Sequence, residues 1–173
     1  MPHQHTPKKP HHLRDDLTGE HKAGDAGQLL LAIVFAAVWI ADSFFFEYTT
    51  FLNRYVSNWI RMPVALAVLA VSGYLALRSL AIVFGEERET PSVIRKGVFK
   101  VVRHPMYLSE VLLYLGLLML SLSLAAAVVW VVAIGFLYYI SRHEERLLVA
   151  RFGEEYEQYQ REVPMWFPRI MRR

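Results

Sequence analysis

The sequence predicts an all-α integral membrane protein with about four transmembrane helices. Hydrophobic residues make up 54% of the 173 residues and the mean hydropathy is +0.25, whereas soluble proteins are about 45–50% apolar. The apolar residues form runs of roughly 20, the length that crosses a hydrocarbon core of about 30 Å. Lys and Arg gather beside these runs rather than along one soluble face, which argues against nucleic-acid binding despite a pI of about 9.2. There are no cysteines, so disulfides and thiolate chemistry are excluded.

The N-terminal half is predicted to hold a tail and two spans. Residues 1–27 contain five of the seven histidines and no apolar period, so a disordered, solvated tail is favoured over a metal site. The first span covers residues 28–46 and includes Asp42. An intramembrane carboxylate is a functional candidate, but near the interface a structural role is favoured. The second span covers residues 62–84 and is interrupted by Arg78, which must face protein, water or a headgroup.

Residues 51–61 carry aromatic side chains at helical spacing opposite Asn, Ser and Arg. This pattern predicts an amphipathic helix in the membrane interface between the first two spans. Packing against neighbouring spans would give the same pattern.

The C-terminal half, residues 85–173, is predicted to be the functional core. A polar loop over residues 85–104 leads into spans at 105–120 and 125–140, which are joined by a tight turn. The second of these helices is expected to continue through residue 151. Gly153 then ends it, and a short polar helix follows over residues 154–163. Trp166 and Phe167 are interpreted as interface anchors.

Two polar motifs meet at one end of this hairpin. Pro105 lies about 16 residues before the turn and Glu144 about 20 after it, so at about 1.5 Å per residue they lie at similar depth. A helix start with Arg103 and His104 therefore faces two carboxylates. Helix N-termini favour anions, and carboxylates favour an ammonium, a sulfonium or a ribose diol. S-adenosylmethionine carries all of these groups. A salt-bridge network at the membrane surface fits the spacing equally well.

The order of the motifs adds a resemblance. GVFKVVRHPMY is followed, after the hairpin, by Glu144-Glu145, then by FGEEYEQY and Val163-Pro164. Over residues 85–168 the chain resembles the isoprenylcysteine carboxyl methyltransferase family and the related phospholipid methyltransferases. The resemblance implies an S-adenosylmethionine site at the cytoplasmic face and a lipid-like substrate, for example an isoprenoid, that enters from the bilayer. Glu144 would hold the cofactor with support from Glu145. The other cofactor-binding residues that it implies are Val93, Ile94, Gly97, His104, Pro105, Met106 and Tyr107.

The catalytic assignments follow from the chemistry of the acceptor. A carboxylate acceptor needs no base, whereas an amine must first lose a proton to Glu145, His143 or water. Arg142 is assigned to orienting an anionic acceptor, although it also fits as a cytoplasmic basic residue. Two other functions stay open, namely a membrane NAD(P)H-dependent reductase and a non-catalytic lipid-binding protein. No metal or nucleic acid is expected, and the compact chain suggests a bacterial inner membrane protein.

The distribution of basic residues predicts the topology. With four spans, sixteen Lys and Arg residues lie on the side of the two termini and two on the other side. The positive-inside rule then places both termini in the cytoplasm. Reporter fusions at residues 1 and 173 should both report a cytoplasmic location, and an external signal from either end would contradict the four-span topology.

Overall fold

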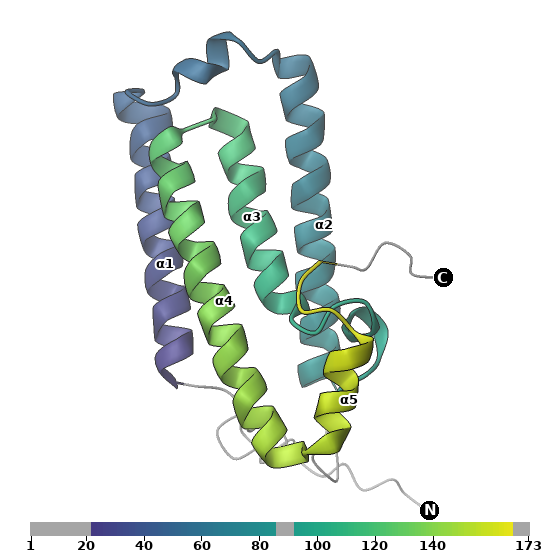
Figure 1. Ribbon diagram of the computed structural model, residues 1–173. Helices are drawn as coiled ribbons and strands as arrows, with labels where there is room; N and C mark the ends of the chain where they lie inside the picture. The colour runs from purple at the N-terminus through teal and green to yellow at the C-terminus, as the bar shows by residue number, and fades with distance from the viewer. Residues whose placement is uncertain (1–21, 86–91, 168–173) are drawn as a thin grey trace, which may run out of the picture.

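All regular elements of the described residues are helical. The computed structural model describes residues 22–85 and 92–167 (Figure 1). Three short turns accompany the helices: η3 (Ala41–Phe46, a π-helical turn), η4 (Phe51–Arg54) and η5 (Gly97–Lys100). The helices are α1 (Lys22–Ile40), α2 (Asn58–Phe84), α3 (Pro105–Ser121), α4 (Leu124–Phe152) and α5 (Glu154–Glu162).

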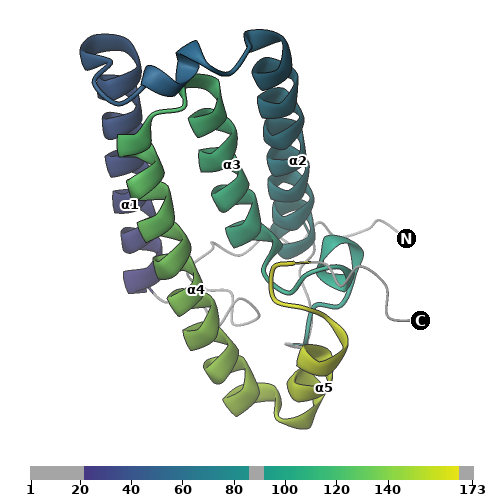
Figure 2. The same ribbon diagram turned by 45° about the horizontal axis from the view of Figure 1, so that its top comes forward.

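The four long helices run side by side, with α3 between α2 and α4, and with α1 against α4 (Figures 1 and 2). Among the described residues, three segments are long and apolar enough to cross a membrane: Ala26–Phe46, Asn58–Phe84 and Leu124–Phe152. The fourth, α3, is apolar but has 17 residues, or about 26 Å at 1.5 Å per residue. The prediction of an all-α membrane protein is confirmed, with three helices of spanning length and one shorter helix among them.

Close packing of α2 on α3 depends on small residues. A Cβ added to Gly116 of α3 would come within 2.6 Å of Leu69 of α2. Nearby, the Ser72 hydroxyl donates to the Ser109 carbonyl at 2.7 Å. Small residues and interhelical hydrogen bonds are the usual means of helix association in membranes, where the hydrophobic effect gives little driving force.

At the end of the bundle away from α5, Asp42 joins α1 to the turn between α3 and α4. Its carboxylate accepts from the Thr49 backbone N–H at 3.1 Å, from the Thr49 hydroxyl and from the Ser123 hydroxyl at 2.5 Å. Ser123 also caps α4 by accepting from the Ala126 N–H at 3.1 Å. These bonds satisfy a carboxylate that is 6% exposed, and they indicate a structural role for it.

Some predicted boundaries need correction. The separate amphipathic helix over residues 51–61 is not formed, because the Ser57 side chain caps a helix that begins at Asn58. Its aromatic residues are exposed, with Trp59 at 91%. The predicted tail over residues 1–27 overlaps α1, which begins at Lys22; residues 1–21 lie outside the described part. The tight hairpin, the extension of α4 through residue 151 and the short polar helix all form, with Gly153 between the last two.

The packing at Gly116 predicts a stability difference between two glycines. Gly116→Val should lower the stability of the bundle by about 1–3 kcal/mol, because the side chain overlaps Leu69 and overpacking costs this much. Gly135→Val is the matched control, because a Cβ there meets nothing within 4 Å. Thermal unfolding in detergent, followed by circular dichroism, should show a lower Tm for Gly116→Val alone. Equal Tm values would contradict the close α2–α3 contact.

Candidate functional site

The chain after α5 folds back onto the start of α3. The backbone N–H groups of Arg103 and His104 donate to the carbonyls of Pro164 and Met165, at 2.9 and 3.2 Å. The Tyr159 hydroxyl of α5 donates to the Phe99 carbonyl in η5 at 2.6 Å. These hydrogen bonds to backbone carbonyls attach the C-terminal segment and α5 to the residues just before α3. The C-terminal segment therefore lies beside the first turn of α3, at the lower end of the bundle in Figure 1.

Glu145 of α4 is the buried centre of this region, with 2% of its side chain exposed. One oxygen, Oε1, lies 2.7 Å from Nε and Nη2 of Arg103 and 3.3 Å from Nε2 of His104. The other, Oε2, accepts from Nε2 of Gln160 at 3.1 Å and lies 3.7 Å from the Arg142 guanidinium. Both oxygens are therefore engaged by protein groups, which suits a positioning role.

Arg103 connects this carboxylate to the C-terminal segment. Its Nη1 donates to the carbonyls of Gln160, at 2.9 Å, and of Val163. A guanidinium has five donors in a planar fork, and here they serve a carboxylate and two carbonyls at the end of α5. The Arg103 side chain thus both stabilises the buried charge of Glu145 and holds the C-terminal segment in place.

Glu144 turns to a different neighbour. Consecutive residues on a helix point about 100° apart, so Glu144 leaves the Arg103 side and accepts from the Tyr107 hydroxyl on α3. Its Oε2 lies 3.7 Å from Nδ1 of His104, and its side chain is 17% exposed. The rings of His104 and Tyr107 stack at 5.6 Å with an interplanar angle of 12°. This carboxylate is less buried than Glu145 and lies beside a helix N-terminus.

The environment of His104 favours the neutral form of its imidazole. Its burial lowers the pKa of the imidazole, although the hydrogen bond to Glu145 opposes that shift. The residue occupies the N-cap of α3 without a side-chain cap, and Pro105 follows it at the first helical position. A neutral imidazole offers one donor and one acceptor, so His104 can donate to one of the two glutamates only, and the contact within hydrogen-bond distance is the one with Glu145.

The structure brings some of the predicted site residues together and separates others. His104, Tyr107, Arg142, Glu144 and Glu145 form one cluster, hereafter the glutamate cluster. Pro105 is buried at the first turn of α3, and Met106 beside it is 37% exposed. Val93, Ile94 and Gly97 precede or begin η5, and Gly97 lies against Ile82 of α2.

Gly97 shows why this position is a glycine. Its φ is +56°, and a Cβ would come within 2.6 Å of Cδ1 of Ile82. Both the backbone angle and the contact disfavour a side chain. The segment approaches α2 by its backbone, on the α2 side of α3 rather than in the glutamate cluster.

Sequence reasoning missed three contributors. Gln160 donates to Glu145 from a helix after the Gly153 break, and Arg103 donates to backbone carbonyls far along the chain; neither contact leaves a spacing signal. Trp166 was expected to be an interface anchor, but it is 5% exposed and packs with Val111 and Leu137. Phe167, at 79% exposure, remains at the surface as expected.

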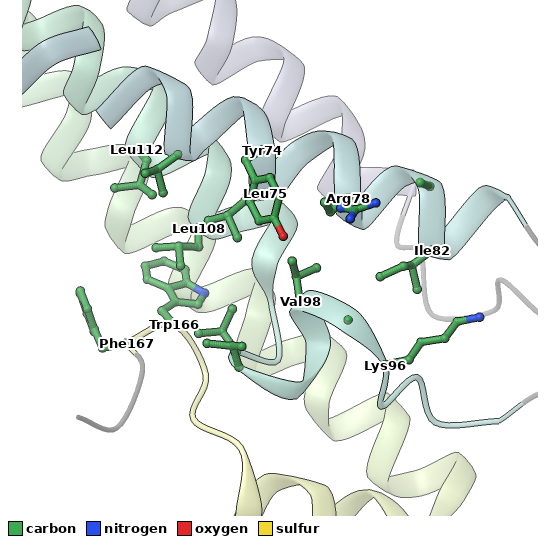
Figure 3. A pocket seen from close by; sticks show the side chains of 15 residues that line it. Tyr74, Leu75, Arg78, Ile82, Lys96, Val98, Leu108, Leu112, Trp166 and Phe167 are labelled. Atoms are coloured by element: carbon green, nitrogen blue, oxygen red, sulfur yellow. The ribbon is translucent and has the colours of Figure 1, made fainter. Parts of the chain in front are cut away.

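A pocket of about 810 Å³ lies on the other face of α3, between α2, η5 and the C-terminal segment. Leu108 and Leu112 form its α3 wall, and Trp166 and Phe167 lie at one side (Figure 3). Most of the lining is apolar; Arg78, Tyr74 and Lys96 supply the polar side chains. The lining residues are Val71, Tyr74, Leu75, Arg78, Ala81, Ile82, Lys96, Gly97, Val98, Val101, Val102, Leu108, Leu112, Trp166 and Phe167.

The chain is similar in sequence to two metal-resistance proteins and to a methyltransferase. It is 29% identical over 120 residues to the cobalt-zinc-cadmium resistance protein CzcN of Cupriavidus metallidurans, covering 68% of this chain and 55% of the relative. It is 30% identical over 122 residues to a methanethiol S-methyltransferase of Crocosphaera subtropica, covering 69% and 47% respectively. The chain thus spans about half the length of these curated relatives. No solved structure gives a significant match.

A family model identifies the family. The model of the phospholipid methyltransferase family matches residues 59–155, from the first turn of α2 into α5. That range contains both glutamates, the start of α3 and most of the pocket lining. It covers more than half of the 173 residues, so the chain belongs to the phospholipid methyltransferase family.

Proposed function

We propose that the chain is an S-adenosylmethionine-dependent membrane methyltransferase that acts on a carboxyl or amine group of a lipid-like acceptor. The observation that carries the proposal is the position of Glu144. It is a partly exposed carboxylate beside the first turn of α3, and the buried residues around it hold it in place. Membership of the phospholipid methyltransferase family supports methyl transfer as the reaction class.

The residues present fit this cofactor. The first-turn N–H groups of a helix have no intrahelical acceptor and favour a carboxylate, and α3 begins beside Glu144. A carboxylate favours an ammonium or a ribose diol, and Glu144 offers one. When bound, the cofactor supplies a methyl group already activated on a sulfonium. We assign His104, Pro105, Met106, Tyr107 and Glu144 to holding it, and Val93 and Ile94 to its adenosine end; Gly97 lines the apolar pocket instead.

The chain's own contribution is then alignment and exclusion of water. Glu145 is assigned a positioning role, because its two oxygens already face Arg103, His104, Gln160 and Arg142. Arg142 is 60% exposed, and we assign it to orienting an anionic acceptor. Holding donor and acceptor in line contributes roughly 7–11 kcal/mol to such reactions, which leaves little need for acid–base chemistry with a carboxylate acceptor.

The acceptor is proposed to enter from the bilayer. The segment over residues 163–167 is bonded to the start of α3 and covers the glutamate cluster, whereas the other walls are membrane helices. An amphiphile would reach this depth with its head already near the cluster. We further propose a cytoplasmic location for this end and for both termini, in a bacterial inner membrane.

Cofactor binding tests the proposal directly. Glu144→Ala should weaken S-adenosylmethionine binding by about ten- to a hundredfold, because a hydrogen bond to a charged group is worth roughly 1.5–3 kcal/mol. Glu154→Ala is the matched control, since that carboxylate is exposed at the start of α5. Calorimetry on detergent-purified protein should show the difference. If the two substitutions changed S-adenosylmethionine affinity equally, the binding site would lie elsewhere. Binding of NADPH instead of S-adenosylmethionine would favour a reductase.

Acceptor entry makes a separate prediction about chain length. Methyl transfer should depend on a long apolar chain and fall steeply as the chain is shortened, because only a membrane-anchored head is held at the depth of the cluster. The measurement is transfer from labelled donor to a series of carboxyl- and amine-headed amphiphiles in liposomes. Methanethiol is included because one relative is named for it. Equal rates for short, water-soluble acceptors would overturn lateral entry.

A further inference from the structure

Arg78 is a cation within a membrane-spanning helix. It lies in α2, whose residues Asn58–Phe84 are long and apolar enough to cross a bilayer. Six residues separate it from the end of the helix, or roughly 9 Å at 1.5 Å per residue. At that depth a long side chain can extend its guanidinium to the headgroup region while its stem lies among apolar groups. An arginine there needs a counter-charge or water.

The protein supplies Arg78 with an aromatic ring rather than an anion. Its guanidinium carbon lies 5.8 Å from the ring centroid of Tyr74, one turn earlier in α2. Over residues 22–85 and 92–167, Arg78 has no ion pair and no side-chain hydrogen bond. Cation–π contact leaves the guanidinium edge, with its donors, available to an anion.

The apolar pocket lies directly beside this cation. Arg78 and Lys96 are in its lining together with Leu75, Ile82 and Leu108, and Figure 3 shows both cations on the side of the pocket away from Leu112 and Phe167. The Arg78 cation beside a predominantly apolar space matches an amphiphile with an anionic head and an apolar chain. A soluble anion would gain nothing from the apolar lining.

Trp166 forms an aromatic part of the pocket wall, with 5% of the residue exposed. Trp166 packs against the core on its other side, with Tyr138 at 6.1 Å, which fixes the ring at the pocket wall.

The source of the occupant follows from the outer surface of α2. Its apolar side chains beside the pocket are exposed, with Leu77 at 70% and Val71 at 51%. In a bilayer that surface is covered by lipid chains, so lipid is at high concentration beside the pocket. We propose that this pocket binds an anionic phospholipid of the surrounding membrane, with its phosphate held by Arg78 and one acyl chain along the apolar lining. This binding is separate from the methyl-transfer proposal.

Brominated lipids test the proposal, because bromine on an acyl chain quenches tryptophan fluorescence on contact. Full-length protein in detergent would be titrated with brominated phosphatidylglycerol and, separately, with brominated phosphatidylcholine. Subtracting the signal of Trp166→Phe isolates the pocket from the other three tryptophans. We expect quenching of Trp166 at a lower mole fraction of phosphatidylglycerol than of phosphatidylcholine. Equal half-saturation for the two lipids would overturn the anionic preference.

Variants assign that preference to Arg78. Arg78→Gln should raise the half-saturating mole fraction of phosphatidylglycerol about tenfold, whereas Lys100→Gln should leave it unchanged. Lys100 is an exposed cation in η5 that does not line the pocket. The proposal would be overturned if Arg78→Gln left the half-saturating mole fraction of phosphatidylglycerol unchanged, or if Lys100→Gln shifted it equally.

Ala81→Phe fills the pocket and should reduce Trp166 quenching by both lipids. Undiminished quenching in that variant would show that no chain binds there.

Discussion

The carboxylate of Glu145 is 2% exposed at one end of a membrane bundle, and the arrangement of that end depends on how its charge is satisfied. Desolvating a carboxylate costs several kcal/mol unless a partner and hydrogen bonds compensate. Arg103, His104 and Gln160 provide this compensation from the start of α3 and from α5. Arg103 also donates from Nη1 to carbonyls near the end of α5. The burial of one charge therefore fixes three separate pieces of chain around the candidate site.

The two consecutive glutamates, Glu144 and Glu145, contact different neighbours. Since adjacent residues on α4 point about 100° apart, Glu145 faces Arg103 while Glu144 faces Tyr107. Without such neighbours, the Glu144 carboxylate, which we propose binds the cofactor, would rotate among solvent-exposed rotamers. Here its helix is held by the buried neighbour, and the Tyr107 hydroxyl orients its oxygen. Asp42 plays a comparable structural part at the opposite end, where it links η3 to the turn before α4. The bundle is thus held by buried carboxylates at both ends.

The sequence was sufficient for features that depend on local patterns. Apolar runs predicted the spans, Pro105 marked the first turn of α3, and Gly153 marked the end of α4. Counting residues from the turn placed His104 and Glu144 at one depth, and their side chains do lie within 3.7 Å. Features that depend on distant backbone were not predictable. The Arg103 contacts reach carbonyls 57 and 60 residues away, and Trp166 is buried by a fold-back that no periodicity encodes. The start of α2 was missed because a serine cap outweighed an amphipathic pattern.

Helix lengths explain why the glutamate cluster lies at the edge of the bundle. From Leu124 to Glu144 is 20 residues of α4, about 30 Å at 1.5 Å per residue, while the 17 residues of α3 span about 26 Å. The two motifs therefore meet where α3 begins and α4 continues past it. Eight further residues take α4 from Glu144 to Phe152, far enough for α5 to return alongside. A shorter α4 would leave no length for that return, and a shorter α3 would place His104 inside the hydrocarbon core. The 17-residue α3 is thus what leaves room for a polar site covered by the chain's own C-terminal segment.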